Sequence, residues 1–347
     1  METSPQRRNK TNNDSFDENG ILLPGLPEDL AQRCLSYLSP SLVFSVCRPW
    51  RRFLYSPSFP PFFSLYALLS PLQNPTLTHP GEIVPQNTIE FNSFDPISSS
   101  WTHLPFPPQH PSLHLLHSHP SFLSRNLPVQ SLTVSNHLVL IAGTNHKLLP
   151  ALFSPLVFNP ESGSWFYGPQ ISTPRRWCAT GSVRGVVYVA SGIGSLYKGD
   201  VARSLEQWDL SKKRDNWRWQ NKARLKDGRF SREAVEAVGY RGKLCMVNVK
   251  GNAVKEGAVY DVDWISSLSK YDDEGDCWVK VVELEQLKRA EQITAARGKI
   301  CVVSANGERI LVVDVGDRPA RFWEVAPPRG LEVVAVHVLP RMCSRQR

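Results

Sequence analysis

The sequence predicts a mainly β protein that begins with a small all-α unit. Residues 26–59 contain three short apolar stripes at helical spacing, and no later segment resembles them. Beyond residue 60, short apolar runs rich in Val, Phe and Trp alternate with turn residues, which is a β pattern. These runs recur together with an Asp or Asn turn and a Trp, so the β part is expected to consist of repeated units.

The helical unit carries start signals for its first two helices. Pro27 suits the first helical position, and Glu28 and Asp29 place negative charge at the positive end of the helix. Ser39 and Pro40 repeat the start signal for a second helix. Each of the three stripes predicts a helix with one buried face, and their members are Leu30, Cys34, Leu35 and Leu38, then Leu42, Val43, Val46 and Cys47, then Trp50, Phe53 and Leu54.

The helical unit is small for an independent domain. We assign residues 21–60 to it and the polar residues 1–20 to a disordered tail. A unit of about 40 residues buries too little apolar area to be comfortably stable alone. Part of its hydrophobic surface is therefore expected to meet another protein, or to cap one end of the domain that follows.

The β part is built from units that end in an apolar strand, a turn and a Trp. The steps between these Trp residues are 64, 52, 61 and 45 positions, a variation expected to fall in loops. A second apolar run precedes each later Trp, at residues 137–143, 186–192, 244–249 and 300–305. The five units are Phe94-Asp95-Pro96 with Trp101, Phe158-Asn159-Pro160 with Trp165, Trp208-Asp209-Leu210 with Trp217, Tyr260-Asp261-Val262 with Trp278, and Val313-Asp314-Val315 with Trp323.

Units of this kind predict a β-propeller, in which each blade is a four-stranded twisted sheet that packs against its neighbours. Large aromatic side chains on the outer strands would fill the wide gap between blades. We place blades two to five near residues 129–168, 177–220, 234–281 and 291–325.

The first blade is expected to close the ring. Its three strands at residues 62–70, 88–95 and 100–105 lack an inner strand, and residues 331–339 are one strand left over. Pairing that last strand into the first blade would remove the open edges. We expect five blades rather than six, a propeller over residues 61–340 and a basic tail over residues 341–347.

The composition favours an intracellular protein. The chain of 347 residues is 41% hydrophobic and 21% charged, which are ordinary values for a folded protein. No run approaches the roughly 18 apolar residues of a membrane helix, and residues 1–16 lack the apolar segment of a secretory signal. We therefore expect the nucleus, the cytoplasm or both, without membrane contact. Seven widely spaced cysteines without a CxxC pair argue against a disulfide framework and a zinc ribbon.

Positive charge is concentrated in residues 203–232. This window holds ten Lys or Arg and four Asp or Glu, so ten minus four gives +6 of the chain's net charge of +8. Such a segment can be a solvated loop face, can attract an acidic protein partner, or can bind nucleic acid without sequence preference. Nucleic acid is the least favoured of the three.

No sequence motif predicts catalysis, a cofactor or a metal site. GxSxG, HExxH and phosphate-binding glycine loops are absent, and a copper oxidase built on a propeller would need a secretory signal. One cluster of histidines lies among prolines that deny it a rigid helix, without a Cys or carboxylate to join it. We interpret it as a loop between the first two blades, with a metal site or a pH-sensitive contact as alternatives. Its members are His103, His110, His114, His117 and His119.

The helical unit carries, in order, Leu26-Pro27-x-Asp29-Leu30, Leu35, Leu38, Val46-Cys47-Arg48-x-Trp50, Leu54 and Ser58-Phe59. This pattern resembles the F-box. Pro49 departs from the family, which commonly has a small residue there, and proline suits a helix only near its start. The resemblance implies docking to the Skp-type adaptor of a cullin-RING ubiquitin ligase. The implied contacts are Leu26, Pro27, Leu30, Leu35, Leu38, Val46 and Trp50.

The third predicted blade carries, in order, Pro174-Arg175, Ala179, Gly185, Val187-Tyr188-Val189, Gly192, Trp208-Asp209 and Trp217. This order resembles a kelch repeat, although the paired glycines of that family are incomplete here. The combined pattern over residues 25–340 is similar to the plant F-box/kelch-repeat proteins. It implies a non-catalytic substrate-recognition subunit of an SCF-type (Skp-cullin-F-box) ubiquitin ligase that needs no cofactor. A scaffold outside any ligase, or a propeller that binds nucleic acid or a small ligand, remain the alternatives.

The propeller topology predicts one binding face. Loops from each outer strand to the next inner strand emerge on the same face as loops between second and third strands. Arginine pairs with carboxylates and phosphates through two hydrogen bonds at once. We therefore expect an acidic or phosphorylated protein substrate to bind at Arg175, Arg176, Lys198, Arg232 and Arg289.

Overall fold

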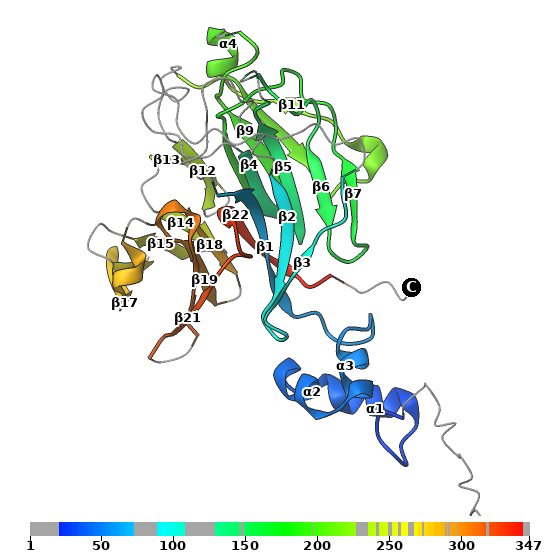
Figure 1. The fold of residues 1–347 in the computed structure, drawn as a ribbon. Helices are drawn as coiled ribbons and strands as arrows, with labels where there is room; N and C mark the ends of the chain where they lie inside the picture. The colour runs from blue at the N-terminus through cyan, green and yellow to red at the C-terminus, as the bar shows by residue number, and fades with distance from the viewer. Residues whose placement is uncertain are drawn as a thin grey trace, which may run out of the picture. The chain divides into compact units, whose positions relative to one another are not determined.

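The protein is described by a computed structural model, shown in Figure 1. The structure describes residues 21–72, 89–107, 129–145, 147, 149–196, 198–226, 235–240, 243–248, 252–255, 258–262, 267–272, 274–288, 290, 292–296, 298–316 and 319–342. The chain divides into two compact units, Met1–Pro60 and Pro61–Arg347. No helix in the described part of the chain is long and apolar enough to cross a membrane.

The first unit contains three short helices, α1 (Glu28–Ser36), α2 (Pro40–Val46) and α3 (Arg48–Leu54). Ser39 caps α2, because its hydroxyl accepts a hydrogen bond from the backbone N–H of Leu42 at 3.4 Å. Pro49 lies in the first turn of α3, where proline leaves no helical hydrogen bond unmade. Pro27 is the residue before α1 rather than its first helical residue. The unusual proline is therefore compatible with a regular third helix.

Trp50 ties the segment before α1 to the third helix. Its indole N–H donates a hydrogen bond to the backbone oxygen of Leu22 at 2.7 Å. Phe53 and Phe59 pack edge to face, with ring centroids 5.4 Å apart. The apolar core of this unit is small and consists of Leu22, Ala31, Leu35, Val43, Phe53, Leu54 and Phe59.

The second unit is mainly β, and its described residues form six antiparallel sheets. Five have four strands and one has two, in the orders β22-β1-β2-β3, β4-β5-β6-β7, β8-β9-β10-β11, β12-β13, β14-β15-β16-β17 and β18-β19-β20-β21. The strands of the first three sheets are β1 (Phe63–Pro71), β2 (Glu90–Asp95), β3 (Ser100–His103), β22 (Leu331–Pro340), β4 (Val129–Val134), β5 (His137–Gly143), β6 (Leu156–Asn159), β7 (Ser164–Tyr167), β8 (Ala179–Val183), β9 (Val186–Ala190), β10 (Leu205–Asp209) and β11 (Gln220–Asn221). The strands of the other three are β12 (Val235–Tyr240), β13 (Lys243–Asn248), β14 (Asn252–Lys255), β15 (Ala258–Val262), β16 (Ser267–Asp272), β17 (Cys277–Glu283), β18 (Gln292–Ala296), β19 (Lys299–Val303), β20 (Ile310–Asp314) and β21 (Arg321–Val325).

The grouping predicted for residues 234–281 as one four-stranded blade is wrong. These residues form two sheets, the hairpin β12-β13 and the four-stranded sheet β14-β15-β16-β17. The reason is that Asn252 starts a new strand close behind β13, where the sequence shows only one apolar run ending near residue 249. The described residues therefore contain one more sheet than the five that the sequence favours.

The C-terminal strand completes the first sheet, as expected for residues 331–339. β22 runs antiparallel to β1 from Phe63 opposite Pro340 to Pro71 opposite Leu331, with one register shift between Leu68 and Leu69. In Figure 1 the red β22 lies along the blue β1. Strands from the two ends of the second unit are thus joined in a single sheet.

The first strand of each sheet contacts the first strand of the next. β4 contacts β8, β8 contacts β12, β12 contacts β14, and β14 contacts β18. β22, which occupies the same position in the first sheet, contacts both β18 and β4.

Arg341 belongs to this sheet region rather than to the predicted basic tail. Its backbone N–H donates a hydrogen bond to the oxygen of Phe62 at 2.8 Å, and the residue is buried. The guanidinium lies 5.2 Å from the centroid of the Phe62 ring. Residues 343–347, like the predicted tail at residues 1–20, are outside the described residues.

The third strand of each four-stranded sheet ends in the same turn. The side chain of its last residue accepts a hydrogen bond from the backbone N–H two positions later, at 2.9 to 3.3 Å. The predicted turn at Asp261 is wrong, because Asp261 lies inside β15 and the turn of that sheet is made by Asp272. The five turn residues are Asp95, Asn159, Asp209, Asp272 and Asp314.

Three tryptophans connect neighbouring sheets at their outer strands. Each indole N–H donates to a backbone oxygen that lies just beyond the outer strand of another sheet. In the third sheet this residue is Trp219, whereas the indole N–H of the predicted Trp217 bonds within its own sheet to Lys212 at 2.7 Å. The bonds run from Trp101 to Ala326, from Trp165 to Pro105 and from Trp219 to Pro169, at 2.9, 2.6 and 2.9 Å.

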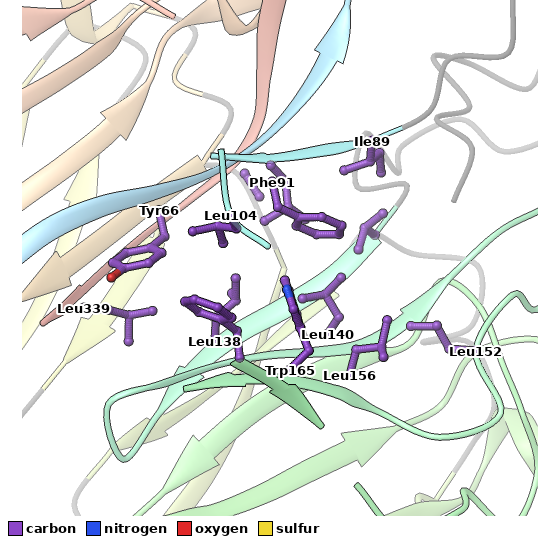
Figure 2. Close-up of a cluster of buried hydrophobic side chains, with 14 of the residues drawn as sticks. Tyr66, Ile89, Phe91, Leu104, Leu138, Leu140, Leu152, Leu156, Trp165 and Leu339 are labelled. Atoms are coloured by element: carbon purple, nitrogen blue, oxygen red, sulfur yellow. The ribbon is translucent and has the colours of Figure 1, made fainter. Parts of the chain in front are cut away.

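The largest hydrophobic cluster lies between the first and second sheets, as Figure 2 shows. Phe91 of β2 packs against Trp165 of β7 with ring centroids 5.0 Å apart, and Tyr66 of β1 lies 6.0 Å from Phe158 of β6. The hydroxyl of Tyr66 donates to the oxygen of Pro340 at 2.8 Å, so its polar end is satisfied. This cluster joins strands from both ends of the second unit.

His337 is a buried titratable group on β22. Its Nε2 lies 2.9 Å from the hydroxyl of Ser131, and its Nδ1 lies 3.3 Å from the hydroxyl of Thr133. Both partners belong to β4, so the imidazole joins two first strands. Burial lowers the pKa of His337 from 6.5 to about 4, because charging it would need solvent that the site excludes.

We expect His337 to make the second unit less stable in acid. Below pH 6.5 the unfolded chain binds a proton at this histidine, whereas the folded chain does not until about pH 4. The stability is therefore complete above pH 6.5 and is lost progressively as the pH falls towards 4, by up to about 3 kcal/mol. Urea unfolding at pH 7 and pH 4.5 should show a smaller difference for His337→Gln. The exposed His103→Gln variant should behave as the wild type does, and an equal loss in His337→Gln would contradict the assignment.

Candidate interaction surfaces

The first two helices expose apolar side chains at helical spacing. On α1, Leu30 is 46% exposed and Cys34, four residues later, is also exposed. On α2, Leu42 and Val46 have the same spacing and are 48% and 51% exposed. Side chains four residues apart lie on one helix face, so each helix presents an apolar stripe to solvent. We call these two pairs the docking stripes.

The predicted stripes therefore divide into buried and exposed parts. In α1, Leu35 is buried together with Ala31, whereas Leu30 and Cys34 point outward. The helical spacing predicts that Leu30, Cys34 and Leu35 share one buried face, and for the first two that expectation is wrong. The buried residues of α1 are Ala31 and Leu35, which lie four positions apart on a single row of the helix.

The adaptor contacts implied by the F-box resemblance fall into three groups. Leu26, Pro27, Leu30 and Val46 are exposed. Leu38 and Trp50 are half-buried, and Leu35 is fully buried. Leu35 therefore cannot contact a partner directly, and it can contribute to a docking surface only by holding α1 in place. Tyr37, which the sequence analysis did not single out, is 79% exposed at the end of α1.

Arg175 does not lie at a surface, so its predicted role as an exposed substrate contact is wrong. It is 1% exposed and forms an ion pair with Glu206 of β10, which is also buried. The same guanidinium donates to the backbone oxygens of Thr173 and Ser191 and to the hydroxyl of Ser204. These bonds hold the segment before β8 against β9 and β10.

Glu206 is the residue that the sequence analysis missed. Its second carboxylate oxygen accepts a hydrogen bond from the hydroxyl of Ser172 at 2.7 Å, so the charge is fully engaged. A signal was present, because Glu206 alternates with the buried Trp208 along a strand and thus had to face the interior.

Arg176, the neighbour of Arg175, is in a different environment. Its backbone N–H and C=O exchange hydrogen bonds with Ile193, both at 2.9 Å. Its guanidinium carbon lies 4.6 Å from the centroid of the Trp177 ring. Burial lowers the pKa of Arg176 from its ordinary value, because desolvation disfavours the charged form.

Of the other three predicted substrate contacts, the structure describes one. Lys198 is exposed in the loop before the short helix α4 (Gly199–Ala202). Arg232 and Arg289 lie outside the described residues. Among the predicted cations that the structure describes, Arg175 is buried, and Arg176 and Lys198 are the two that are at least partly exposed.

Part of the basic window at residues 203–232 is engaged inside the second unit. Arg214 stacks on Phe166, with the guanidinium carbon 4.0 Å from the ring centroid. Arg224 pairs with Asp200 at 2.7 Å, and the Nε of Arg203 donates to the oxygen of Leu225 at 3.2 Å. These contacts reduce the positive charge that the window can present to a partner.

Within the described ranges, no group of three or more His, Cys, Asp or Glu is placed to hold a metal ion. His103, the first of the clustered histidines, is exposed at the end of β3. The other members, His110, His114, His117 and His119, lie outside those ranges.

No family model matches the chain. The Arabidopsis thaliana protein described as F-box/kelch-repeat protein SKIP25 is 46% identical over an alignment of 382 positions, which includes 98% of this chain and 94% of that relative. A solved structure described as the structure of YjhT aligns with 69% of this chain and 76% of its own, with 10% identity and a TM-score of 0.36. That TM-score is too low to assign a fold. The similarity to the Arabidopsis protein extends over both units.

Proposed function

We propose that this chain, which belongs to the plant F-box/kelch-repeat proteins, is the substrate-recognition subunit of an SCF-type ubiquitin ligase. The observation that carries this proposal is the pair of docking stripes on α1 and α2. A small unit that leaves four apolar side chains in solvent on regularly spaced positions is suited to a protein partner. The partner proposed is the Skp-type adaptor, and through it the cullin and RING subunits.

The docking stripes would supply the centre of the adaptor interface. Leu30, Leu42 and Val46 are each about half exposed, so burying them on a partner removes apolar area from water. Leu26 and Pro27 would extend the contact at the start of α1. Leu35 and Trp50 would act indirectly, by holding α1 and α3 in place.

We infer that the second unit is a closed propeller of six blades that binds a protein substrate. The chain of contacts from β4 through β8, β12, β14 and β18 to β22, and back from β22 to β4, supports closure. The indole bond from Trp101 of the first sheet to Ala326, just beyond the last sheet, supports it at the outer strands. The blade formed by β12 and β13 has two strands in the described residues.

The protein would act without covalent chemistry of its own. Holding a substrate in the same complex as the charged ubiquitin carrier raises the effective concentration of substrate lysines near the transfer site. The substrate would be an acidic or phosphorylated protein. The place of action would be the nucleus, the cytoplasm or both.

The adaptor interface is tested by the double variant Leu30→Ala with Val46→Ala. Both side chains are exposed, so the variant should fold normally and lose binding only. Truncating two central apolar contacts costs about 2 kcal/mol or more, which weakens affinity for the adaptor about thirtyfold. Calorimetric titration of the purified full chain with a Skp-type adaptor measures this loss.

A matched control is Leu196→Ala, which removes a leucine of the second unit that is 72% exposed. It should bind the adaptor as the wild type does. Leu35→Ala is not a clean test, because Leu35 is part of the core of the first unit. Unchanged affinity in the double variant would refute docking through these stripes.

Participation in a ligase needs a separate test. Proximity labelling in plant cells should identify substrate proteins, and deletion of residues 26–59 should make those proteins accumulate. Substrates that are labelled but keep their normal turnover after the deletion would indicate a scaffold outside the ligase.

A further inference from the structure

Arg175 and Arg176, which precede β8 in the sequence, differ in how their positive charge is compensated. Arg175 has the carboxylate of Glu206 and three further oxygen acceptors. The Nε and Nη1 of Arg176 are withdrawn from solvent and have no hydrogen-bond partner among the described residues. Glu206, the carboxylate that neutralises Arg175, is already committed to Arg175 and Ser172.

The unpaired guanidinium is held in place from two sides. The backbone of Arg176 is fixed by its two hydrogen bonds with Ile193, which join the loop before β8 to the loop after β9. The guanidinium stacks on Trp177, and Trp177 is itself buried and donates its backbone N–H to Oε1 of Gln130 at 3.1 Å. A receptor that is already ordered loses little entropy when a ligand arrives.

Leaving charged donors buried and unpaired costs free energy, so a native structure keeps them for a reason. Arg176 is half-buried as a residue, so part of its side chain is open to solvent although Nε and Nη1 are not. The missing component is an acceptor with negative charge. A planar or tetrahedral oxyanion matches the guanidinium, because it can accept two of its N–H groups at once.

We propose that Arg176 is the receptor for an oxyanion, a carboxylate or a phosphate, carried by the protein that the second unit binds. This inference rests on the proposed function in one respect, namely that the anion is carried by a protein substrate. The surroundings favour its approach, since Lys198 is exposed in the loop that continues from Ile193. The window at residues 203–232 carries an excess of six positive charges in the sequence, part of which is engaged inside the second unit.

The test uses the full chain and three capped peptides, Gly-Gly-X-Gly-Gly, in which X is phosphoserine, glutamate or glutamine. The phosphoserine and glutamate peptides should bind and the neutral glutamine peptide should not. Arg176→Gln should weaken binding of the charged peptides about tenfold or more. Arg176→Lys should fall between the two, because lysine keeps the charge but not the planar fork. The tighter of the two charged peptides identifies phosphate or carboxylate as the natural anion.

Arg184→Gln is the matched control, because Arg184 is exposed in the turn at the opposite end of the same β8-β9 hairpin. It removes the same charge and should leave peptide binding unchanged. Equal binding by Arg176→Gln and the wild type, or no preference for the charged peptides over the glutamine peptide, would overturn the proposal.

Thermal unfolding separates a receptor from a structural arginine. Removing an uncompensated charge should leave the Tm of Arg176→Gln equal to or above that of the wild type, and inorganic phosphate should raise the Tm of the wild type only. A lower Tm for Arg176→Gln would show that the guanidinium supports the fold and would contradict the proposal.

Adaptor binding depends on the docking stripes of the first unit, whereas peptide binding depends on Arg176 of the second unit. Failure of adaptor binding would therefore refute the ligase assignment while leaving anion binding by Arg176 intact.

Discussion

A chain that ends after Gly330 is expected to lose the native fold of its second unit. The truncation removes β22, whose side chains lie in two of the hydrophobic clusters: Ala335 and Leu339 in one, and Val333, Val336 and Val338 in the other. Burying five such side chains contributes roughly 8–12 kcal/mol as an upper estimate. That is comparable with the whole stability of an ordinary domain, about 5–15 kcal/mol. The truncation also leaves β1 as an open edge.

Circular dichroism and urea unfolding measure this loss. The control is a chain that ends after Met342, which keeps β22 and its bonds to β1. It should unfold at the wild-type midpoint. Addition of a synthetic peptide covering residues 331–342 should restore part of the structure of the shorter chain. Cooperative unfolding of the Gly330 truncation near the wild-type midpoint would show that β22 is dispensable.

Replacement of Arg175 by alanine is expected to destabilise the second unit by about 3–5 kcal/mol. The side chains of Arg175 and Glu206 are 1% and 3% exposed, so the variant leaves a carboxylate buried without its partner. The hydroxyl of Ser172 alone cannot compensate that charge. Urea unfolding at pH 7 measures the change in the free energy of unfolding.

Two further variants separate burial from charge pairing. Arg224→Ala breaks the pair with Asp200, whose side chains are 63% and 79% exposed, and should cost less than about 1 kcal/mol. Arg175→Met combined with Glu206→Leu removes both buried charges and should recover most of the lost stability. A loss for Arg175→Ala as small as that for Arg224→Ala would refute the buried ion pair.

The sequence predicts the strands well where local signals are complete. The turns at Asp95, Asn159, Asp209 and Asp314 follow an apolar strand and are confirmed by their hydrogen bonds. An Asp or Asn side chain bonds to its own backbone two residues on, so the signal lies within a few residues. Asp261 fails the same test because β15 continues through it.

The division into sheets is less visible in the sequence. The steps from Trp101 to Trp165 and from Trp217 to Trp278 are nearly equal, 64 and 61 positions. The second of these steps contains an additional sheet, β12-β13, whereas the first contains the strands of one sheet in its described part. Spacing alone does not distinguish additional strands from a long connection, because both lengthen the chain equally.

The candidate sites likewise depend on contacts that spacing in the sequence does not show. Arg175 and Arg176 are identical in type and adjacent in sequence. Arg175 is neutralised by Glu206, whereas Nε and Nη1 of Arg176 have no hydrogen-bond partner among the described residues. The partner of Arg175 comes from a strand about thirty positions later. The alternation along β10 indicates that Glu206 faces the interior, but it does not show which cation Glu206 meets. Leu30 and Leu35 were likewise assigned to one face, and their exposures are 46% and 1%.

Local sequence signals were sufficient to predict a short helical unit followed by repeated β units, and a last strand that pairs into the first sheet. Helix caps, turns and alternation are set by neighbouring residues, so they can be read without a structure. The packed structure was needed to show the register of β22 on β1, the division of residues 234–281 into two sheets, and which charges and apolar side chains remain unpaired. Burial and charge compensation depend on contacts between residues distant in the chain, and those contacts exist only once the sheets have packed.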